Sequence, residues 1–329
     1  MSLSSNSQFK VYGARRADVA DARLHTAIIG LAIAAVFLLS AIAQTLLHTY
    51  FSIAYPALTE NDWYSWAISL LPMYLLGMPI AYLLLRTIPA NAPQKQSLHP
   101  LMWFGFFALC FCLSLVANLI GQMVSLWFAE RIGADVEIQN ELANQTVSVS
   151  FASNLLFVGI LGPIFEELFY RKAIIDRLQR YGDLPAILLS GMAFGLIHGN
   201  FNQLFYTTVV GMLLGYIYLR TGSVLYTISI HIAYNLIGGV FSTELMRRVG
   251  ENGLPAIDDL TGWLMLLAYL LFYVSSIIIS VIFVGISGRH FSGSLQTGEC
   301  SLSFWQWLRA VILNPGIWIF LFVVLLLFL

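Results

Sequence analysis

The chain has 329 residues, of which 59% are hydrophobic and 10% are charged, and its mean hydropathy is +0.80. This composition is too apolar for a soluble globular protein and indicates an integral membrane protein. The formal net charge of -1 excludes an overall basic field that would attract nucleic acid, so we expect the lipid bilayer, and no nucleic acid, as a partner.

Apolar runs along the chain predict its membrane spans. A transmembrane helix needs roughly 20 mostly apolar residues, and this template finds about eight or nine passes. The expected spans are 26–47, 64–86, 101–128, 151–174, 184–199, 204–220, 224–241, 262–286 and 312–329. The fifth to seventh are short and closely spaced, so one of them is expected to be tilted or partly re-entrant. The predicted fold class is therefore an all-α, polytopic transmembrane helical bundle.

The domain organisation is simple. Residues 1–24 form a polar amino-terminal tail, and residues 25–329 form a single membrane domain without a convincing internal repeat. The first long apolar run starts after more than twenty polar residues and lacks a clear cleavage site downstream, so we expect no cleavable signal peptide.

Positively charged residues predict the orientation, because Lys and Arg collect in cytoplasmic loops. With the amino terminus inside and nine passes, thirteen of the 16 basic residues fall on the cytoplasmic side. They are Lys10, Arg15, Arg16, Arg23, Arg86, Lys95, Arg171, Lys172, Arg177, Arg180, Arg220, Arg289 and Arg309. Only Arg131, Arg247 and Arg248 fall on the other side, so we expect a cytoplasmic amino terminus and acidic loops 130–150 and 242–261 that face out.

Two adjacent carboxylates interrupt the apolar stretch from Phe151 to Tyr170, namely Glu166 and Glu167. The other fifteen acidic residues fall in termini, loops or loop edges. Ionisable groups at bilayer depth are costly and mark functional sites by default. This pair is therefore the strongest pointer to function in the chain.

The helical period separates the roles of the two carboxylates. Glu167 and Arg171 are four residues apart and share a face, so they can form an ion pair. Glu166 points about 100° away and is left free to act as a general base toward water. The alternative is a buried Glu-Arg pair that only stabilises helix packing, but a second glutamate without an evident partner disfavours it.

Two later apolar stretches carry further polar side chains. His198 follows Phe194 by four residues, and His231 and Asn235 are four residues apart on one helical face. An amide beside an imidazole can fix its tautomer or donate to a developing oxyanion. Alternatively, His198 is an interfacial residue and the His231–Asn235 pair holds helices together. The concentration of all these groups within about seventy residues favours a catalytic site.

Together the motifs Glu166-Glu167-x-x-x-Arg171, Phe194-x-x-x-His198 and His231-x-x-x-Asn235 resemble those of the CPBP family, the CAAX proteases and bacteriocin-processing enzymes, also called the Abi family. The resemblance covers about residues 150–241, the expected catalytic core. It implies an intramembrane endopeptidase in which Glu166 activates water and His198 helps to hold it. His231 and Asn235 would stabilise the oxyanion, and Glu167 and Arg171 would organise the site as an ion pair.

The cofactor stays open at this level. The residues include no H-E-x-x-H helix, but two histidines and two glutamates could form a zinc site, with Glu166, His198 and His231 as the ligands. Carboxylate chemistry without a metal fits the same residues, and we favour it.

We therefore expect a protease of a bacterial plasma membrane that cleaves a peptide or a membrane-anchored protein. One rival is a non-catalytic bacteriocin-immunity or scaffold protein. Another is a proton-coupled transporter, which would need an inverted repeat that we do not find. One geometric difficulty remains, because Glu166 lies near the cytoplasmic end of its predicted span and His198 near the outer end of the next. Either the helix extends past residue 174 towards Arg180, or the 199–203 link dips inward.

Overall fold

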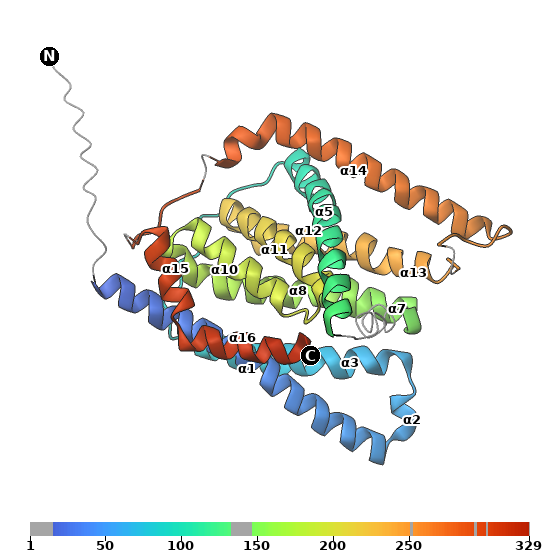
Figure 1. The fold of residues 1–329 in the computed structure, drawn as a ribbon, viewed down its shortest axis with the longest axis horizontal. Helices are drawn as coiled ribbons and strands as arrows, with labels where there is room; N and C mark the ends of the chain where they lie inside the picture. The colour runs from blue at the N-terminus through green and yellow to red at the C-terminus, as the bar shows by residue number, and fades with distance from the viewer. Residues whose placement is uncertain (1–15, 133–146, 251–252, 293–294, 301, 329) are drawn as a thin grey trace.

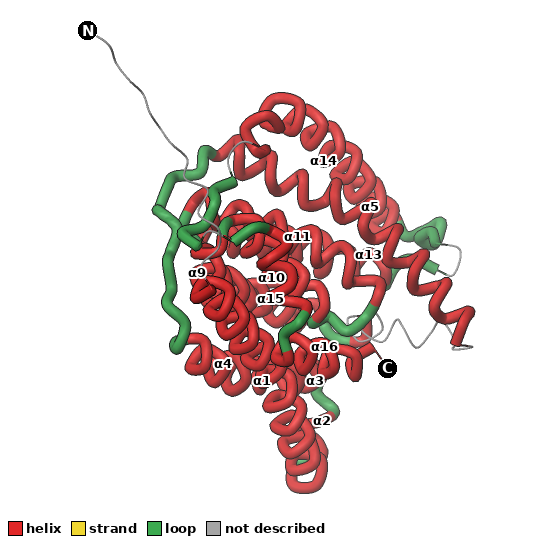
Figure 2. The backbone as a smooth tube through the Cα atoms, turned by 60° about the vertical axis from the view of Figure 1, so that its left-hand side comes forward, coloured by secondary structure: helices red, strands yellow, loops and turns green. Residues whose placement is uncertain are grey.

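The computed structural model describes residues 16–132, 147–250, 253–292, 295–300 and 302–328. Most of the predicted polar tail and of the loop 130–150 therefore lies outside the described residues. The described ranges contain helices joined by loops and no strand, apart from two isolated bridges, Gly182 with Thr297 and Val249 with Pro255 (Figures 1 and 2). The predicted all-α helical bundle is confirmed.

The helical elements follow one another with short connections. In chain order they are α1 Arg16–Ala54, α2 Pro56–Thr59, α3 Asp62–Pro72, η1 Met73–Gly77, α4 Met78–Leu85, α5 Pro100–Ile132, α7 Phe151–Asn154, η3 Leu155–Leu161, α8 Gly162–Glu167, η4 Leu168–Ile175, α9 Asp176–Leu178, η5 Gln179–Tyr181, α10 Asp183–Leu196, α11 Phe201–Thr221, α12 Val224–Asn235, η6 Leu236–Phe241, α13 Ser242–Met246, α14 Leu260–Ser292, α15 Phe304–Ile312 and α16 Pro315–Phe328.

Six helical segments within the described residues are long and apolar enough to cross a membrane, or seven if the bent pair α15–α16 is one span. They are Ala17–Ala54, Asp62–Leu85, Pro100–Arg131, Phe151–Tyr181, Val224–Met246 and Leu260–Gly288. The predicted count of about eight or nine also included α10 and α11. The structure forms both as helices, but α10 has only 14 residues, a length of about 21 Å.

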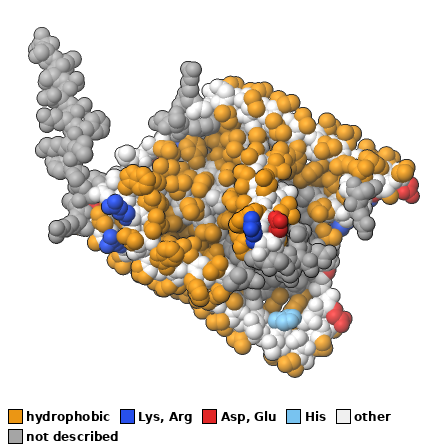
Figure 3. Space-filling view, in the orientation of Figure 1, with side chains coloured by type: hydrophobic (Ala, Val, Ile, Leu, Met, Phe, Trp, Pro, Cys, Tyr) orange, Lys and Arg blue, Asp and Glu red, His pale blue; other side chains and the backbone are white. Residues whose placement is uncertain are grey.

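The surface agrees with a lipid environment. Figure 3 shows hydrophobic side chains over most of the drawn face, with few charged groups between them. On α14, Leu271 and Ile278 are 58% and 54% exposed. Contiguous apolar surface of this kind is unusual on soluble proteins, whereas it is favourable against acyl chains.

The helical segment that carries the two glutamates is longer than predicted. It runs without a break from Phe151 to Tyr181 rather than ending at residue 174. Glu166 is consequently fifteen residues from each end, in the middle of the segment. The structure therefore adopts the first of the two predicted alternatives, in which the helix extends past residue 174 towards Arg180.

Contacts between chain segments define two ends of the bundle. At one end, the buried Arg177 side chain donates to the Leu85 carbonyl, and the Gln96 amide donates to Thr221 O at 2.8 Å. At the other end, the Arg247 side chain donates to Val147 O at 3.1 Å. The first end, which we call the basic end, gathers the termini of α4, η5 and α11, where the predicted cytoplasmic residues concentrate.

Candidate active site

The predicted Glu167–Arg171 ion pair is present at the centre of the bundle. Arg171 Nε lies 2.9 Å from Glu167 Oε2 and Arg171 Nη2 lies 3.1 Å from Glu167 Oε1, so the pair is bidentate. Both side chains are fully buried. The guanidinium also donates to Ser190 Oγ at 3.2 Å and lies 5.3 Å from the centre of the Phe194 ring. These contacts fix the carboxylate of Glu167 in a single orientation.

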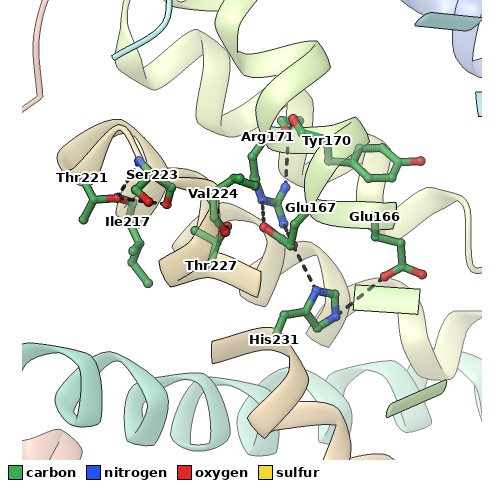
Figure 4. A network of polar contacts seen from close by, with 11 residues as sticks. Glu166, Glu167, Tyr170, Arg171, Ile217, Thr221, Ser223, Val224, Thr227 and His231 are labelled. Atoms are coloured by element: carbon green, nitrogen blue, oxygen red, sulfur yellow. Dashed lines mark hydrogen bonds and ion pairs between the residues drawn. The ribbon is translucent and has the colours of Figure 1, made fainter. Parts of the chain in front are cut away.

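His231 links the two adjacent glutamates, as Figure 4 shows. Its Nδ1 is 3.0 Å from Glu167 Oε1, and its Nε2 is 3.7 Å from Glu166 Oε2. An ionised carboxylate can only accept, so Nδ1 carries the proton in this contact. Glu167 thereby orients the ring and leaves Nε2 directed at Glu166. A carboxylate that accepts from one ring nitrogen fixes the tautomer and orientation of catalytic and metal-bound histidines in the same way.

Glu166 faces a large cavity. Its side chain is 15% exposed, whereas that of Glu167 is fully buried. The cavity has a volume of about 770 Å³, and its walls include Glu166, His198, His231 and Asn235. The structure thus brings these four predicted site residues to one space. Glu167 and Arg171 are not in its wall and lie behind His231.

The turn between α10 and α11 carries His198 into the cavity wall. The two helices pack closely, because a Cβ on Gly195 would overlap Thr208 of α11. The chain then reverses at Gly199, whose φ of +65° is a left-handed conformation that favours glycine. Asn200 caps α11 by accepting from the Gln203 amide at 2.9 Å. His198 is therefore placed by two helices and a tight turn.

Phe194 connects the two histidines. The His198 Nδ1–H donates to the Phe194 carbonyl at 2.9 Å, which leaves Nε2 of His198 as an acceptor. The Phe194 ring contacts both imidazoles edge to face, with centroid distances of 5.2 Å to His198 and 5.7 Å to His231. Phe194 therefore contacts both histidines and the Arg171 guanidinium and also lines the cavity, which its place in the F-x-x-x-H motif alone did not indicate.

Asn235 ends α12 on the face that carries His231, as the spacing predicts. Its Nδ2 donates to Val158 O at 2.9 Å, which leaves one amide hydrogen and the carbonyl oxygen for the cavity. Val158 belongs to η3, and another π-helical segment, η6, starts directly after Asn235. π-Helical turns leave backbone groups without their usual partners and are frequent at functional sites.

The zinc alternative names Glu166, His198 and His231 as ligands. Among the residues that the structure describes, no three His, Cys, Asp or Glu side chains stand close enough to hold a metal ion together. Glu166, His198 and His231 share the cavity wall without forming such a group. The described side chains supply one partly exposed carboxylate, two oriented imidazoles and an amide to this cavity.

One polar face of the cavity, on α5, was not predicted from the sequence. Ser114, Asn118, Gln122 and Ser125 all line the cavity. Their spacing of three and four residues places them on one side of a helix, which is a signal that the apolar template of a membrane span does not register.

Comparisons with known proteins bear on the same region. Residues 148–237 match the family model described as type II CAAX prenyl endopeptidase Rce1-like, and this stretch contains all six predicted site residues. A Bacillus subtilis (strain 168) protein named "Putative membrane peptidase YdiL" is 26% identical over 200 residues, which covers 59% of this chain and 79% of that protein. No solved structure gives a significant match.

Proposed function

We propose that the chain is an intramembrane endopeptidase of the CPBP family in which Glu166 activates the attacking water, in line with the family match over residues 148–237 and the similarity to the Bacillus subtilis protein. The observation that carries the proposal is the shared cavity of Glu166, His198, His231 and Asn235. A buried structural network would have no reason to direct one carboxylate into an open space. The substrate class is a membrane-associated protein or peptide.

The proposed reaction begins with water between Glu166 and the substrate. Glu166 takes a proton from the water, whose oxygen forms a bond to the carbon of the scissile amide. The neutral Nε2 of His198 accepts a hydrogen bond from the same water and orients it. This role agrees with the Nδ1 contact to Phe194, which leaves Nε2 without a proton.

The oxygen of the former carbonyl then carries negative charge. The free amide hydrogen of Asn235 donates to it, and His231 donates through Nε2 when that nitrogen is protonated. Glu167 and Arg171 act through His231, because they fix its ring and do not reach the cavity. The carbon–nitrogen bond breaks when Glu166 returns its proton to the leaving nitrogen, which yields a carboxylic acid and an amine.

Membrane orientation belongs to the same proposal. We assign the basic end to the cytoplasm of a bacterial plasma membrane, in line with the preference of Lys and Arg for cytoplasmic loops. The cavity extends the other way, towards Ser125 of α5 and Met246 of α13. The substrate would then enter from the side opposite the cytoplasm.

Two substitutions in the purified protein test the proposal. Wild type, Glu166→Gln and His198→Ala are reconstituted in lipid nanodiscs and offered a library of quenched fluorescent peptides, and cleavage is followed by fluorescence and mass spectrometry. We expect both variants to lose at least 10²-fold in rate, the usual contribution of a general base. Equal cleavage by all three proteins would refute the catalytic assignment and favour the scaffold interpretation.

Chelation tests the metal question in the same assay. We expect the rate to survive dialysis against EDTA, because the carboxylate and the histidines suffice for the proposed steps. Loss of activity with EDTA and its recovery with Zn²⁺ would show that a metal, and not Glu166 alone, activates the water.

A further inference from the structure

The polar face of α5 has a property that helix packing does not explain. Ser114 accepts from Tyr234 Oη at 2.8 Å and donates to Cys110 O, so it is engaged within the protein. Among the described residues, the side-chain amides of Asn118 and Gln122 have no hydrogen-bond partner. Polar residues that hold membrane helices together bond across the interface, and these two do not.

Only one face of α5 reaches the cavity. Leu119 and Met123, each one position further along, are 55% and 70% exposed and are absent from the cavity wall, whereas Leu115 and Leu126 line it beside the polar stripe. Free amides facing lipid would be costly. The amides of Asn118 and Gln122 instead line the cavity, where water or a substrate can satisfy them.

The stripe begins beside the catalytic residues and leads away from them. Ser114 touches Tyr234, the residue before Asn235. Further along, α5 crosses the start of α11 closely, because a Cβ on Gly121 would lie 2.7 Å from the Phe201 carbonyl. That crossing brings Asn202, another amide of the cavity wall, near Gln122. The wall from Ser114 to Ser125 is about 16 Å long at 1.5 Å per residue.

The chemistry of the stripe matches a polypeptide main chain. A primary amide offers both a donor and an acceptor, which are the two groups that an extended peptide presents at every residue. A length of about 16 Å corresponds to about five extended residues. Among the described lining residues, Glu166 is the one acidic side chain, and none is Lys or Arg. Away from Glu166, the described wall therefore has no Asp, Glu, Lys or Arg to pair with a charged substrate residue.

We infer that Asn118 and Gln122 bind the main chain of an extended, uncharged substrate segment on its way to Glu166. The inference rests on the proposed protease function and deepens it, because it names the class of substrate and the residues that position it. Asn118 and Gln122 are positioning residues, and the reacting atoms lie beyond them. Their loss should weaken substrate binding and leave the chemical step intact.

The test uses uncharged quenched fluorescent peptides that the wild type cleaves, trimmed one residue at a time from each end. The double variant Asn118→Ala/Gln122→Ala is compared with the matched control Leu119→Ala/Met123→Ala in nanodiscs. Two lost hydrogen bonds should raise KM for the longest peptide about tenfold, with kcat within about twofold of wild type. Peptides too short to reach the stripe should be cleaved equally by all proteins, and a merely structural role would not produce this dependence on length.

Binding to an inactive protein distinguishes failure of the stripe from failure of the proposed protease function. In the Glu166→Gln background, the anisotropy of a labelled long peptide should show about tenfold weaker binding for the double variant than for the control. If cleavage depends on Glu166 but the double variant Asn118→Ala/Gln122→Ala has the KM of wild type, the role of the stripe is overturned and the proposed function stands. Equal binding of the long peptide by the double variant and the control would have the same meaning. Cleavage that does not depend on Glu166 would refute the proposed function, and the binding comparison would still decide the stripe.

Discussion

The buried ion pair behind the site allows a quantitative prediction. Arg171→Met removes the guanidinium while keeping much of its volume, and it leaves the fully buried Glu167 carboxylate without a cation. Breaking a buried pair on one side costs about 3–5 kcal/mol. The variant also loses the bond to Ser190, worth about 1 kcal/mol, and the contact with Phe194, worth up to about 2 kcal/mol when desolvated.

A double-mutant cycle isolates the ion pair from these other losses. Glu167→Gln keeps an oxygen that can accept from His231 Nδ1 but removes the negative charge. The losses at Ser190 and Phe194 occur in both backgrounds and cancel in the cycle. We expect Arg171→Met to cost at least 2 kcal/mol less in the Glu167→Gln background than in wild type, near the upper range of measured couplings.

The assay is reversible unfolding in mixed micelles, titrated with SDS and followed by circular dichroism, for the wild type, both single variants and the double variant. Leu119→Ala, on the exposed face of α5, serves as the control and should change stability little. A coupling below about 0.5 kcal/mol would refute the reasoning. A coupling that small would mean that Arg171 stabilises the bundle through packing and that the buried Glu167 carboxylate does not need the positive charge of Arg171.

Three further predictions concern helix packing, pH and the oxyanion. Gly195→Ala should lower the free energy of unfolding by about 1–3 kcal/mol, and activity with it, because the added methyl overlaps Thr208. The control Gly285→Ala, with open space around it, should not destabilise the protein. Equal effects of the two variants would contradict this packing. Asp259 accepts from a backbone amide and from an arginine, which hold the pKa of its carboxyl below the usual range. The ionised carboxylate therefore contributes to folding stability above its unfolded pKa, and this contribution is lost as the pH falls through the folded pKa. Asp259→Asn should lower the melting temperature at pH 7 and not at pH 2. A difference in melting temperature that does not depend on pH would contradict this origin. Asn235→Asp should reduce kcat about 10²–10³-fold with little change in KM, measured on the peptide library, and a pure KM effect would contradict its oxyanion role.

Contacts within one helix were predictable from the sequence. The i,i+4 rule anticipates the Glu167–Arg171 pair and places His231 and Asn235 on one face, since the helical period alone decides which side chains are neighbours. The helical bundle follows from composition for a similar reason, because apolar runs in a membrane must form helices to satisfy their backbone. The number of passes did not follow from composition in the same way, since α10 forms a helix of only 14 residues, which is short for a span.

What the sequence determined by itself was thus the bundle, the unusual charges inside it and their pairing along each helix. Only the tertiary structure decided that His231 lies between the two glutamates, that His198 shares their cavity and that the amides of Asn118 and Gln122 face it. The physical reason is that separations along a helix follow from backbone geometry, whereas distances between helices depend on packing. Here the close contact at Gly195, the turn at Gly199 and the crossing at Gly121 set those distances, and no local pattern in the chain encodes them.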